Sequence, residues 1–374
     1  MKKRLLFILL LIPSFLNGQC DRLIDSLALV DLYNGTGGPA WIYTWDLSKP
    51  MNTWYGITLN SEGCVQCIDL DGRLDCSGST FNNLGNNLDG QIPESIGNLS
   101  QVEFISFGNN FLTGPIPSTI GLLTELTDLI LRYNNLTGTI PSELGNLQNL
   151  DLLNLTSNDL TGKIPDELGF SERLSWIFLS SNDLTGEIPS TLSNLNQLIA
   201  LGAADNHLSG EIPGFLGNIL DRLHLQNNEF VGCFPEELMA ICKESVIFTG
   251  NIALPWQGDF EQFCDGNEQI GAPCEDGLSD TENFINEDCE CETITSTTSI
   301  NNTLLRIFPN PVSKGFCIED QNYEEYEFTL FTIAGQKIDM LETNCYDMSH
   351  LPLGIYILSS QHVNTRQLTK IIKH

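Results

Sequence analysis

One spacing limits what this chain can fold into more than any other feature: glycine recurs every 24 residues through its middle. The glycines with this spacing are Gly90, Gly114, Gly138, Gly162, Gly186 and Gly210, and Gly232 follows after 22 residues. An asparagine stands four residues before each of them, and a proline three residues after. Such self-similarity is the signature of a stack of equivalent structural units, each of which needs its neighbours to bury its apolar side.

The repeated unit reads L-x-x-L-x-L-x-x-N-x-L-x-G-x-I-P-x-x-L-G-x-L and is clearest from Leu150 onward. The alternation over residues 153–155 predicts a short strand with one buried face, so stacked repeats should form a parallel sheet over a leucine core. The amide of Asn158 both donates and accepts, and a column of such residues can satisfy buried backbone groups. Gly162 permits a backbone conformation that side chains disfavour, and Pro165 starts the return path.

This unit resembles the plant-type leucine-rich repeat of receptor-kinase ectodomains and polygalacturonase-inhibiting proteins, over residues 86–240. The resemblance implies an α/β-type repeat solenoid with parallel strands on a concave face that binds peptides, proteins or glycans. Residues 20–85, which include Trp41, Trp45 and Trp54, resemble the N-terminal cap of such proteins. We expect these tryptophans to form the core of the cap, and a carbohydrate platform is the alternative.

The N-terminus indicates export. Lys2, Lys3 and Arg4 precede a short apolar run, which is typical of a secretory signal peptide over residues 1–19. No later stretch has the roughly eighteen consecutive apolar residues of a membrane helix, so we expect no membrane insertion. Gln19 is not the small residue that a lipoprotein signal places before its cysteine, which disfavours lipidation of Cys20.

The twelve cysteines fit an oxidising compartment, in which disulfides persist. They fall into three even-numbered groups, which are Cys20, Cys64, Cys67 and Cys76; Cys233, Cys242, Cys264, Cys274, Cys289 and Cys291; and Cys317 and Cys345. Pairing can therefore close within each group, although the sequence does not fix the pairs. The spacing Cys64-x-x-Cys67 also suits zinc, but a disulfide is favoured in an exported chain.

Residues 241–291 are expected to form a cysteine-rich C-terminal cap. Acidic side chains cluster there, and Asp276, Asp280 and Glu282 are weak candidates for a structural Ca²⁺ site, because calcium takes carboxylate oxygens as ligands. The spacing of an EF-hand loop is absent. Apart from this candidate calcium ion, we expect no cofactor.

The end of the chain has a different pattern. Residues 292–303 are polar and rich in Ser and Thr, which predicts a linker. Strand-like alternation in residues 328–333 and 355–358 predicts a small all-β, sandwich-like domain over residues 304–374. Segments 305–311, 351–356 and 370–373 resemble the type IX secretion sorting domain of the Bacteroidota. The resemblance implies contact with the type IX machinery and delivery outside the cell, with the mature protein either released or attached to the outer-membrane surface.

Stacked strands align side chains in columns on the solvent side of the predicted sheet. The columns form an apolar and aromatic patch, whose members are Phe104, Ile130, Tyr133, Leu152, Trp176 and Phe178. Exposed aromatic patches often mark binding sites, and the alternative is that these bulky residues pack on their neighbours. Asp205, Arg222 and His224 form a polar group near the last coil that suits a carboxylate or sugar hydroxyls, with a structural ion pair as the alternative.

Charge and residue inventory narrow the function. With 48 acidic and 17 basic residues the net charge is −31, which disfavours nucleic acid and anionic membranes as partners. Ser181, Asp205 and His224 come from successive coils without a nucleophile elbow or oxyanion loop, so we expect no enzyme. We interpret the chain as an extracellular recognition module for a protein, peptide or polysaccharide. A structural adhesin or surface spacer is the rival interpretation, and a secreted hydrolase is the weakest.

Overall fold

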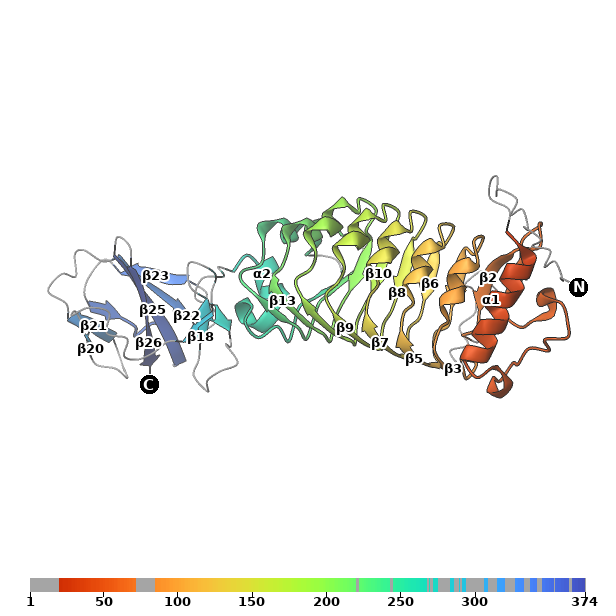
Figure 1. Ribbon diagram of the computed structural model, residues 1–374. Coiled ribbons are helices and arrows are strands. Elements are labelled where there is room, and N and C mark those ends of the chain that lie inside the picture. The colour runs from red at the N-terminus through yellow and green to blue at the C-terminus, as the bar shows by residue number, and fades with distance from the viewer. Residues whose placement is uncertain are drawn as a thin grey trace, which may run out of the picture.

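The structure is a computed structural model that describes residues 20–71, 85–219, 222–242 and 245–267 and shorter segments beyond them. These segments are residues 269, 272–274, 283–285, 289, 291–293, 306–308, 315–319, 327–332, 337–341, 345–352, 354–362 and 365–373. The repeats stack as the coils of a solenoid, with helix α1 (Arg22–Gly35) at one end and the strands of the C-terminal domain beyond the other (Figure 1). The predicted signal peptide lies outside the described residues.

One sheet, called the inner sheet below, takes one strand from each coil. Its strands, in spatial order, are β1 (Ile57–Leu59), β2 (Val65–Asp69), β4 (Phe104–Ser106), β6 (Asp128–Ile130), β8 (Leu152–Asn154), β10 (Trp176–Phe178), β12 (Ala200–Gly202), β14 (Arg222–His224) and β16 (Ser245–Ile247). β1 and β2 are antiparallel, and every pairing from β2 to β16 is parallel. Trp176 lies opposite Leu152 on one side and Ala200 on the other, so equivalent residues form columns as predicted.

Each coil from β4 to β14 buries the middle residue of its inner strand. Ile105, Leu129, Leu153, Ile177, Leu201 and Leu223 are all fully buried. The chain then enters a second parallel sheet, whose strands are β3 (Asp89–Gly90), β5 (Phe111–Pro115), β7 (Asn135–Thr139), β9 (Asp159–Gly162), β11 (Asp183–Gly186), β13 (His207–Glu211) and β15 (Glu229–Val231). The repeat proline then precedes a short 3-10 helix: η3 (Glu94–Asn98), η4 (Ser118–Leu122), η5 (Ser142–Asn146), η6 (Asp166–Phe170), η7 (Ser190–Asn194), η8 (Gly214–Asn218) or η9 (Glu236–Ile241). The predicted leucine core is confirmed.

The repeat asparagines form a ladder that links successive coils. Asn158 donates from Nδ2 to the carbonyls of Leu131 and Leu155, at 3.1 and 3.0 Å. Its Oδ1 accepts from the backbone N–H of Leu136 at 3.1 Å. Donation to a carbonyl of its own coil and to one in the preceding coil recurs at Asn110, Asn134, Asn182, Asn206 and Asn228. The predicted role of these amides in satisfying buried backbone groups is confirmed.

The N-terminal cap packs α1 and an aromatic cluster over the first coil. Asp21 caps α1 by accepting from the backbone N–H of Leu23, and η1 (Gly38–Ala40) and η2 (Met51–Thr53) follow in the chain. Trp41, Trp45 and Trp54 are at most 5% exposed, and the rings of Trp45 and Trp54 stack with centroids 5.0 Å apart. The tryptophans are therefore cap core, and the alternative of a carbohydrate platform is wrong.

The C-terminal end carries one coil more than the repeat pattern indicates. β16 continues the inner sheet past residue 240, and Asn251 donates to the carbonyl of Leu225 and accepts from the N–H of Phe230, as a further member of the ladder. After β16 the chain forms η10 (Pro255–Gly258) and α2 (Phe260–Cys264). Phe260 and Phe263 of α2 form a cluster of aromatic rings with Phe248. A small sheet of β17 (Pro273–Cys274), β18 (Asn283–Ile285) and β19 (Cys291–Thr293) follows. β19 therefore enters the segment in which we expected a linker.

Disulfides close within the predicted cysteine groups. Cys20 pairs with Cys64 in the N-terminal cap, while Cys233 pairs with Cys289 and Cys242 with Cys264 at the other end. Cys67 is also disulfide-bonded, which excludes the zinc alternative for Cys64-x-x-Cys67 in this state. The sulfur of Cys20 is engaged in its disulfide, and this supports the expectation that it carries no lipid.

The C-terminal domain consists of two antiparallel sheets, in agreement with a sandwich-like fold. One sheet contains β20 (Arg306–Phe308), β21 (Gly315–Glu319) and β24 (Cys345–Asp347); the other contains β22 (Glu327–Thr332), β23 (Lys337–Leu341), β25 (Gly354–His362) and β26 (Thr365–Lys373). The backbones of Cys317 and Cys345 lie opposite each other in the first sheet. This register is the one that the predicted Cys317–Cys345 disulfide requires.

Candidate functional site

Two aromatic side chains stand together on the open face of the inner sheet, the face turned away from the core. Trp176 and Phe178 are the first and last residues of β10, and both are half-buried. Their ring centroids are 6.2 Å apart, with the planes tilted by 34°. The middle residue Ile177 points into the core, so the alternation of the strand places both rings on the same side.

The next coil has small residues beside these rings. Ala200 and Gly202 of β12 pair with Trp176 and Phe178. A Cβ atom on Gly202 would lie 3.1 Å from Cδ1 of Phe178, so the ring of Phe178 lies against the glycine backbone. Large rings beside a coil of small residues keep part of each ring accessible, as an anchor for a ligand requires.

Tyr133 extends this aromatic surface on the far side of β8. It is 50% exposed, and the guanidinium of Arg132 lies 5.7 Å from its ring centroid. Its φ of 54° falls in the left-handed region, as do the equivalent positions in other coils, occupied by Asn109, Ser157, Ser181, Asp205 and Asn227. Asn, Asp and Gly adopt this conformation more readily than a bulky residue does, and such strain concentrates at functional sites.

The rest of the predicted patch is less uniform. Phe104 and Leu152, each at the start of its strand, are half-buried on the open face. Ile130 is only 4% exposed, so its assignment to an accessible patch is wrong. The adjacent Ser106 in the same column is fully buried, which shows that the face is closed over at this end. Side chains on a concave sheet converge, and a residue between two coils is easily covered.

Two members of the predicted polar group bind neighbouring polar side chains. Oδ1 of Asp205 accepts from Nδ2 of Asn227 at 2.6 Å, and Nε2 of His224 lies 3.0 Å from Oγ of Ser245. Among the described residues no ion pair joins Asp205 to Arg222, and a structural ion pair within this group stays an alternative. Arg222 is exposed and remains available to a ligand. Ser245 is a surface residue of β16 that the repeat pattern missed, and its signal was Phe248-x-x-Asn251, 23 residues after Asn228.

An acidic side chain stands in the same column of the inner sheet as Leu152 and Trp176. Asp128 begins β6, and its Oδ2 accepts a 2.7 Å hydrogen bond from Oγ1 of Thr127. Burial raises the pKa of the Asp128 carboxyl, the hydrogen bond from Thr127 opposes that rise, and the negative charge of Asp151 adds to it. The carboxyl therefore holds its proton to a higher pH in the folded protein than in the unfolded chain.

This shift predicts a pH dependence of stability. A raised pKa means that the folded state binds the proton more tightly, so the contribution of Asp128 to stability is present at low pH and is lost as pH rises through the raised pKa. Asp128→Asn removes this titration. Urea unfolding of both proteins between about pH 3.5 and 7 should show the wild type losing free energy of unfolding, relative to the variant, as pH rises. A difference that is constant with pH would contradict the assignment.

Within the described residues, one group of side chains has its ligand atoms close enough to hold a metal ion, and it consists of Cys20, Asp25 and Cys64. The two sulfurs of this group are joined in a disulfide. The calcium candidates Asp276, Asp280 and Glu282 lie outside the described residues, so that hypothesis stays a prediction.

Comparisons with known proteins agree with both halves of the architecture. Residues 124–184 match the family described as Leucine rich repeat, and residues 306–374 match the Secretion system C-terminal sorting domain. No curated protein matches the chain significantly.

Several solved structures resemble the solenoid. The crystal structure of PEPR1–AtPEP1 is 29% identical over 62% of this chain and 32% of its own, with a TM-score of 0.52. A TDR receptor is 37% identical over 43% of this chain and 28% of its own, with a TM-score of 0.41. The ectodomain of the plant membrane receptor kinase GASSHO1/SCHENGEN3 from Arabidopsis thaliana, in complex with CASPARIAN STRIP INTEGRITY FACTOR 2, is 28% identical over 62% of this chain and 30% of its own, with a TM-score of 0.47. The chain thus spans about a third or less of the length of these proteins.

Residues 124–184 are leucine-rich repeats, and the solenoid resembles the repeats of the PEPR1–AtPEP1 structure. C-terminal to its repeats, the chain carries a type IX secretion sorting domain, which marks it for export to the cell exterior. Within the part of the chain that the structure describes, no helix is long and apolar enough to cross a membrane.

Proposed function

We propose that this protein is an extracellular recognition module that binds an extended peptide or protein segment along the open face of its inner sheet. The observation that carries the proposal is the pair of partly exposed rings of Trp176 and Phe178 beside a coil of small residues. Clustered aromatic side chains on a rigid scaffold supply most of the binding energy in many interfaces. Nothing in this role requires catalysis.

The flanking residues fit an extended segment better than a compact ligand. Tyr133 lies two coils before Trp176–Phe178 on one edge of the face, while Arg222 and His224 lie two coils after them. A peptide that crosses these coils contacts the aromatic rings at its centre and places an acidic group near Arg222. The likeness to the PEPR1–AtPEP1 structure supports a peptide ligand in preference to a polysaccharide.

Thermal and urea unfolding of the full chain, in the presence of a panel of synthetic peptides, tests the proposal. A peptide at about a hundred times its dissociation constant should raise the free energy of unfolding by roughly 2.7 kcal/mol. Trp176→Ala/Phe178→Ala should abolish this gain, because truncating anchor residues costs at least about 2 kcal/mol of binding energy. Phe170→Ala is the matched control, since Phe170 is 53% exposed but lies on η6, away from the inner sheet.

Three outcomes would contradict the proposal in different ways. A gain that persists in the double variant moves the site elsewhere. A gain seen with polysaccharides and with none of the peptides keeps the site and overturns the ligand class. If none of the peptides and none of a set of polysaccharides changes the stability of the protein, the result supports the rival interpretation, a structural spacer.

A further inference from the structure

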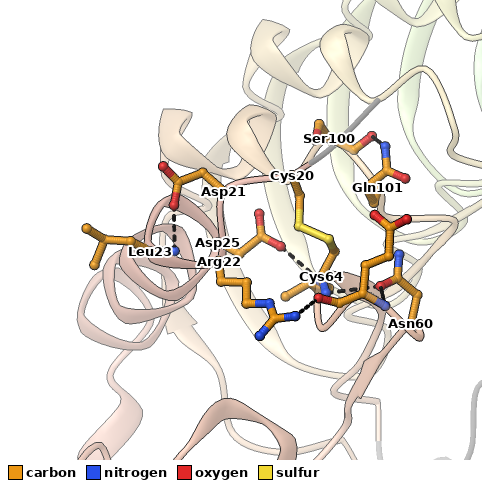
Figure 2. Close-up of a disulfide and its surroundings, with 11 residues drawn as sticks. Cys20, Asp21, Arg22, Leu23, Asp25, Asn60, Cys64, Ser100 and Gln101 are labelled. Carbon is orange, nitrogen blue, oxygen red and sulfur yellow. Dashed lines mark hydrogen bonds between the residues drawn. A yellow bond between two sulfur atoms is a disulfide. The ribbon is translucent and has the colours of Figure 1, made fainter. Parts of the chain in front are cut away.

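The N-terminal disulfide lies beside a buried carboxylate. Cys20 precedes the capping residue of α1, Cys64 precedes β2, and their bond ties the helix to the β1–β2 hairpin (Figure 2). Asp25, in the first turn of α1, is 1% exposed. Its Oδ2 accepts from the backbone N–H of Val65 at 2.8 Å, while Oδ1 is buried without a hydrogen-bond partner among the described residues.

The three reactive atoms are within reach of one another. The Sγ atoms of Cys20 and Cys64 and a carboxylate oxygen of Asp25 all lie within 4.8 Å. Among the described residues, no other disulfide has a carboxylate oxygen this close to both sulfurs. A structural role for Asp25 requires only Oδ2, which binds Val65, and leaves the position of Oδ1 unexplained.

The two sulfurs differ in access to solvent. Cys20 is partly exposed, whereas Cys64 is 2% exposed. Thiol–disulfide exchange proceeds by attack of a thiolate on one sulfur and departure of the other as a thiolate. An external thiol therefore reaches Cys20, and the sulfur that leaves is that of Cys64. A thiolate on Cys64 forms in a buried site, where charge is disfavoured and a proton is needed.

Asp25 is the acidic side chain that the described residues place within 4.8 Å of the Cys64 sulfur and the Cys20 sulfur together. Asp21, the N-terminal cap of α1, adds a negative charge, and Arg22 donates to the carbonyl of Glu62 on the hairpin loop (Figure 2). Burial raises the pKa of Asp25, the N–H of Val65 opposes this, and Asp21 raises it further. A carboxyl with a raised pKa is better matched to a thiol than an ordinary one, because a free thiol has a pKa of about 8.5.

We propose that Cys20, Cys64 and Asp25 form a thiol–disulfide exchange centre in which Asp25 transfers the proton of Cys64. In opening, the thiolate of a small external thiol attacks Sγ of Cys20, forms a mixed disulfide there and expels the Cys64 thiolate, which takes the proton of Asp25. A second external thiolate then attacks the mixed disulfide, frees Cys20 as a thiolate and leaves as the oxidised disulfide of the reagent. In closing, the carboxylate of Asp25 takes the proton of Cys64, whose thiolate attacks a mixed disulfide on Cys20 and expels the external thiolate.

The rates of opening and closing in the full-length oxidised protein test this role. Dithiothreitol opens the bond and oxidised glutathione closes it, and alkylation followed by mass spectrometry follows each disulfide separately. Asp25→Asn should slow both directions for Cys20–Cys64 by at least about tenfold, because a positioned general acid or base accelerates proton transfer by roughly 100-fold or more. Cys242–Cys264 in the same molecule should be unaffected, and Asp31→Asn, an exposed change on α1, should behave as wild type.

A merely structural role gives a different result. If Asp25 only holds the cap together, Asp25→Asn changes opening and closing in opposite directions, because it shifts the equilibrium between the two states. That result, or equal rates in variant and wild type, overturns the proposal.

A measurement on the wild type alone guards against a variant that does not fold. At a fixed concentration of dithiothreitol thiolate, the opening rate of Cys20–Cys64 should fall as pH rises through the titration of Asp25, while that of Cys242–Cys264 should not. A flat profile for Cys20–Cys64 would also overturn the proposal.

Discussion

Replacing Asn158 by alanine is expected to destabilise the solenoid by about 3 kcal/mol, the combined cost of one orphaned N–H and two weakened carbonyl contacts. Asn158 is 8% exposed and makes three side-chain hydrogen bonds to backbone groups of two coils. The N–H of Leu136 loses its side-chain acceptor in the variant. The carbonyls of Leu131 and Leu155 each keep one bond, from Asn134 and Asn182, so their loss is smaller.

The midpoint and slope of urea unfolding measure this effect. Asn135→Ala is the matched control, because Asn135 is exposed at the start of β7 in the preceding repeat and should change stability by less than about 0.5 kcal/mol. A loss for Asn158→Ala as small as that of the control would show that the ladder does not hold neighbouring coils together. A reduced slope would instead indicate that the coils on either side unfold separately, as repeat proteins can.

The asparagine ladder could be predicted from the sequence because its chemistry is local. An amide at a fixed place in each repeat has both a donor and an acceptor, so the kind of partner follows from the residue type. The same logic extends to Asn251, although the leucines and the glycine that accompany the other ladder residues are degenerate around it. The extra coil keeps the repeat asparagine but lacks the repeat glycine and proline, so a repeat defined by those two residues ends one coil too early.

The exposure of side chains on the open face could not be predicted from the sequence in the same way. Ile130 and Phe178 occupy the same column, yet one is buried and the other half-exposed. The difference depends on the residues that face each of them from adjacent coils, such as Gly202 beside Phe178. A column read from sequence predicts which residues share a face, and the packing of that face decides which of them a ligand can reach.

The burial of Asp25 is a second feature that the sequence alone does not predict. Its partner Val65 is 40 residues away in sequence, and the contact exists because the disulfide and the hairpin bring β2 against α1. As a lone acidic residue near the start of the predicted cap, Asp25 gives no signal of burial in the sequence, and carboxylates in the first turn of a helix are common and exposed. The candidate exchange centre is therefore a product of the fold of the cap.

The second glycine of the repeat has the other large effect that the structure predicts. A Cβ atom on Gly145 in η5 would lie 2.2 Å from the carbonyl oxygen of Glu167 in the next coil. The equivalent atoms on Gly97, Gly121 and Gly169 would lie 2.3–2.4 Å from a carbonyl oxygen of the next coil. The obstacle is backbone and cannot rotate aside, so Gly145→Ala is expected to cost about 3 kcal/mol, the upper end of the usual range for overpacking.

The chain contains its own control for this prediction, because the equivalent position two coils later is Ser193. Leu195 and Leu198, which follow it, are 5% and 6% exposed, whereas the matching Leu147 and Leu150 after Gly145 are fully buried. The coils at Ser193 have therefore already adjusted to a Cβ atom, and Ser193→Ala should change the free energy of unfolding by less than about 0.5 kcal/mol.

Urea unfolding of the two alanine variants compares the same residue at the same place in two coils. If Gly145→Ala is as mild as Ser193→Ala, the coils separate at little cost, and close approach of their backbones does not stabilise the stack. If the two differ as expected, the spacing of the coils is set by the repeat glycines. The looser packing after Ser193 is then the local consequence of replacing that glycine by a residue with a Cβ atom.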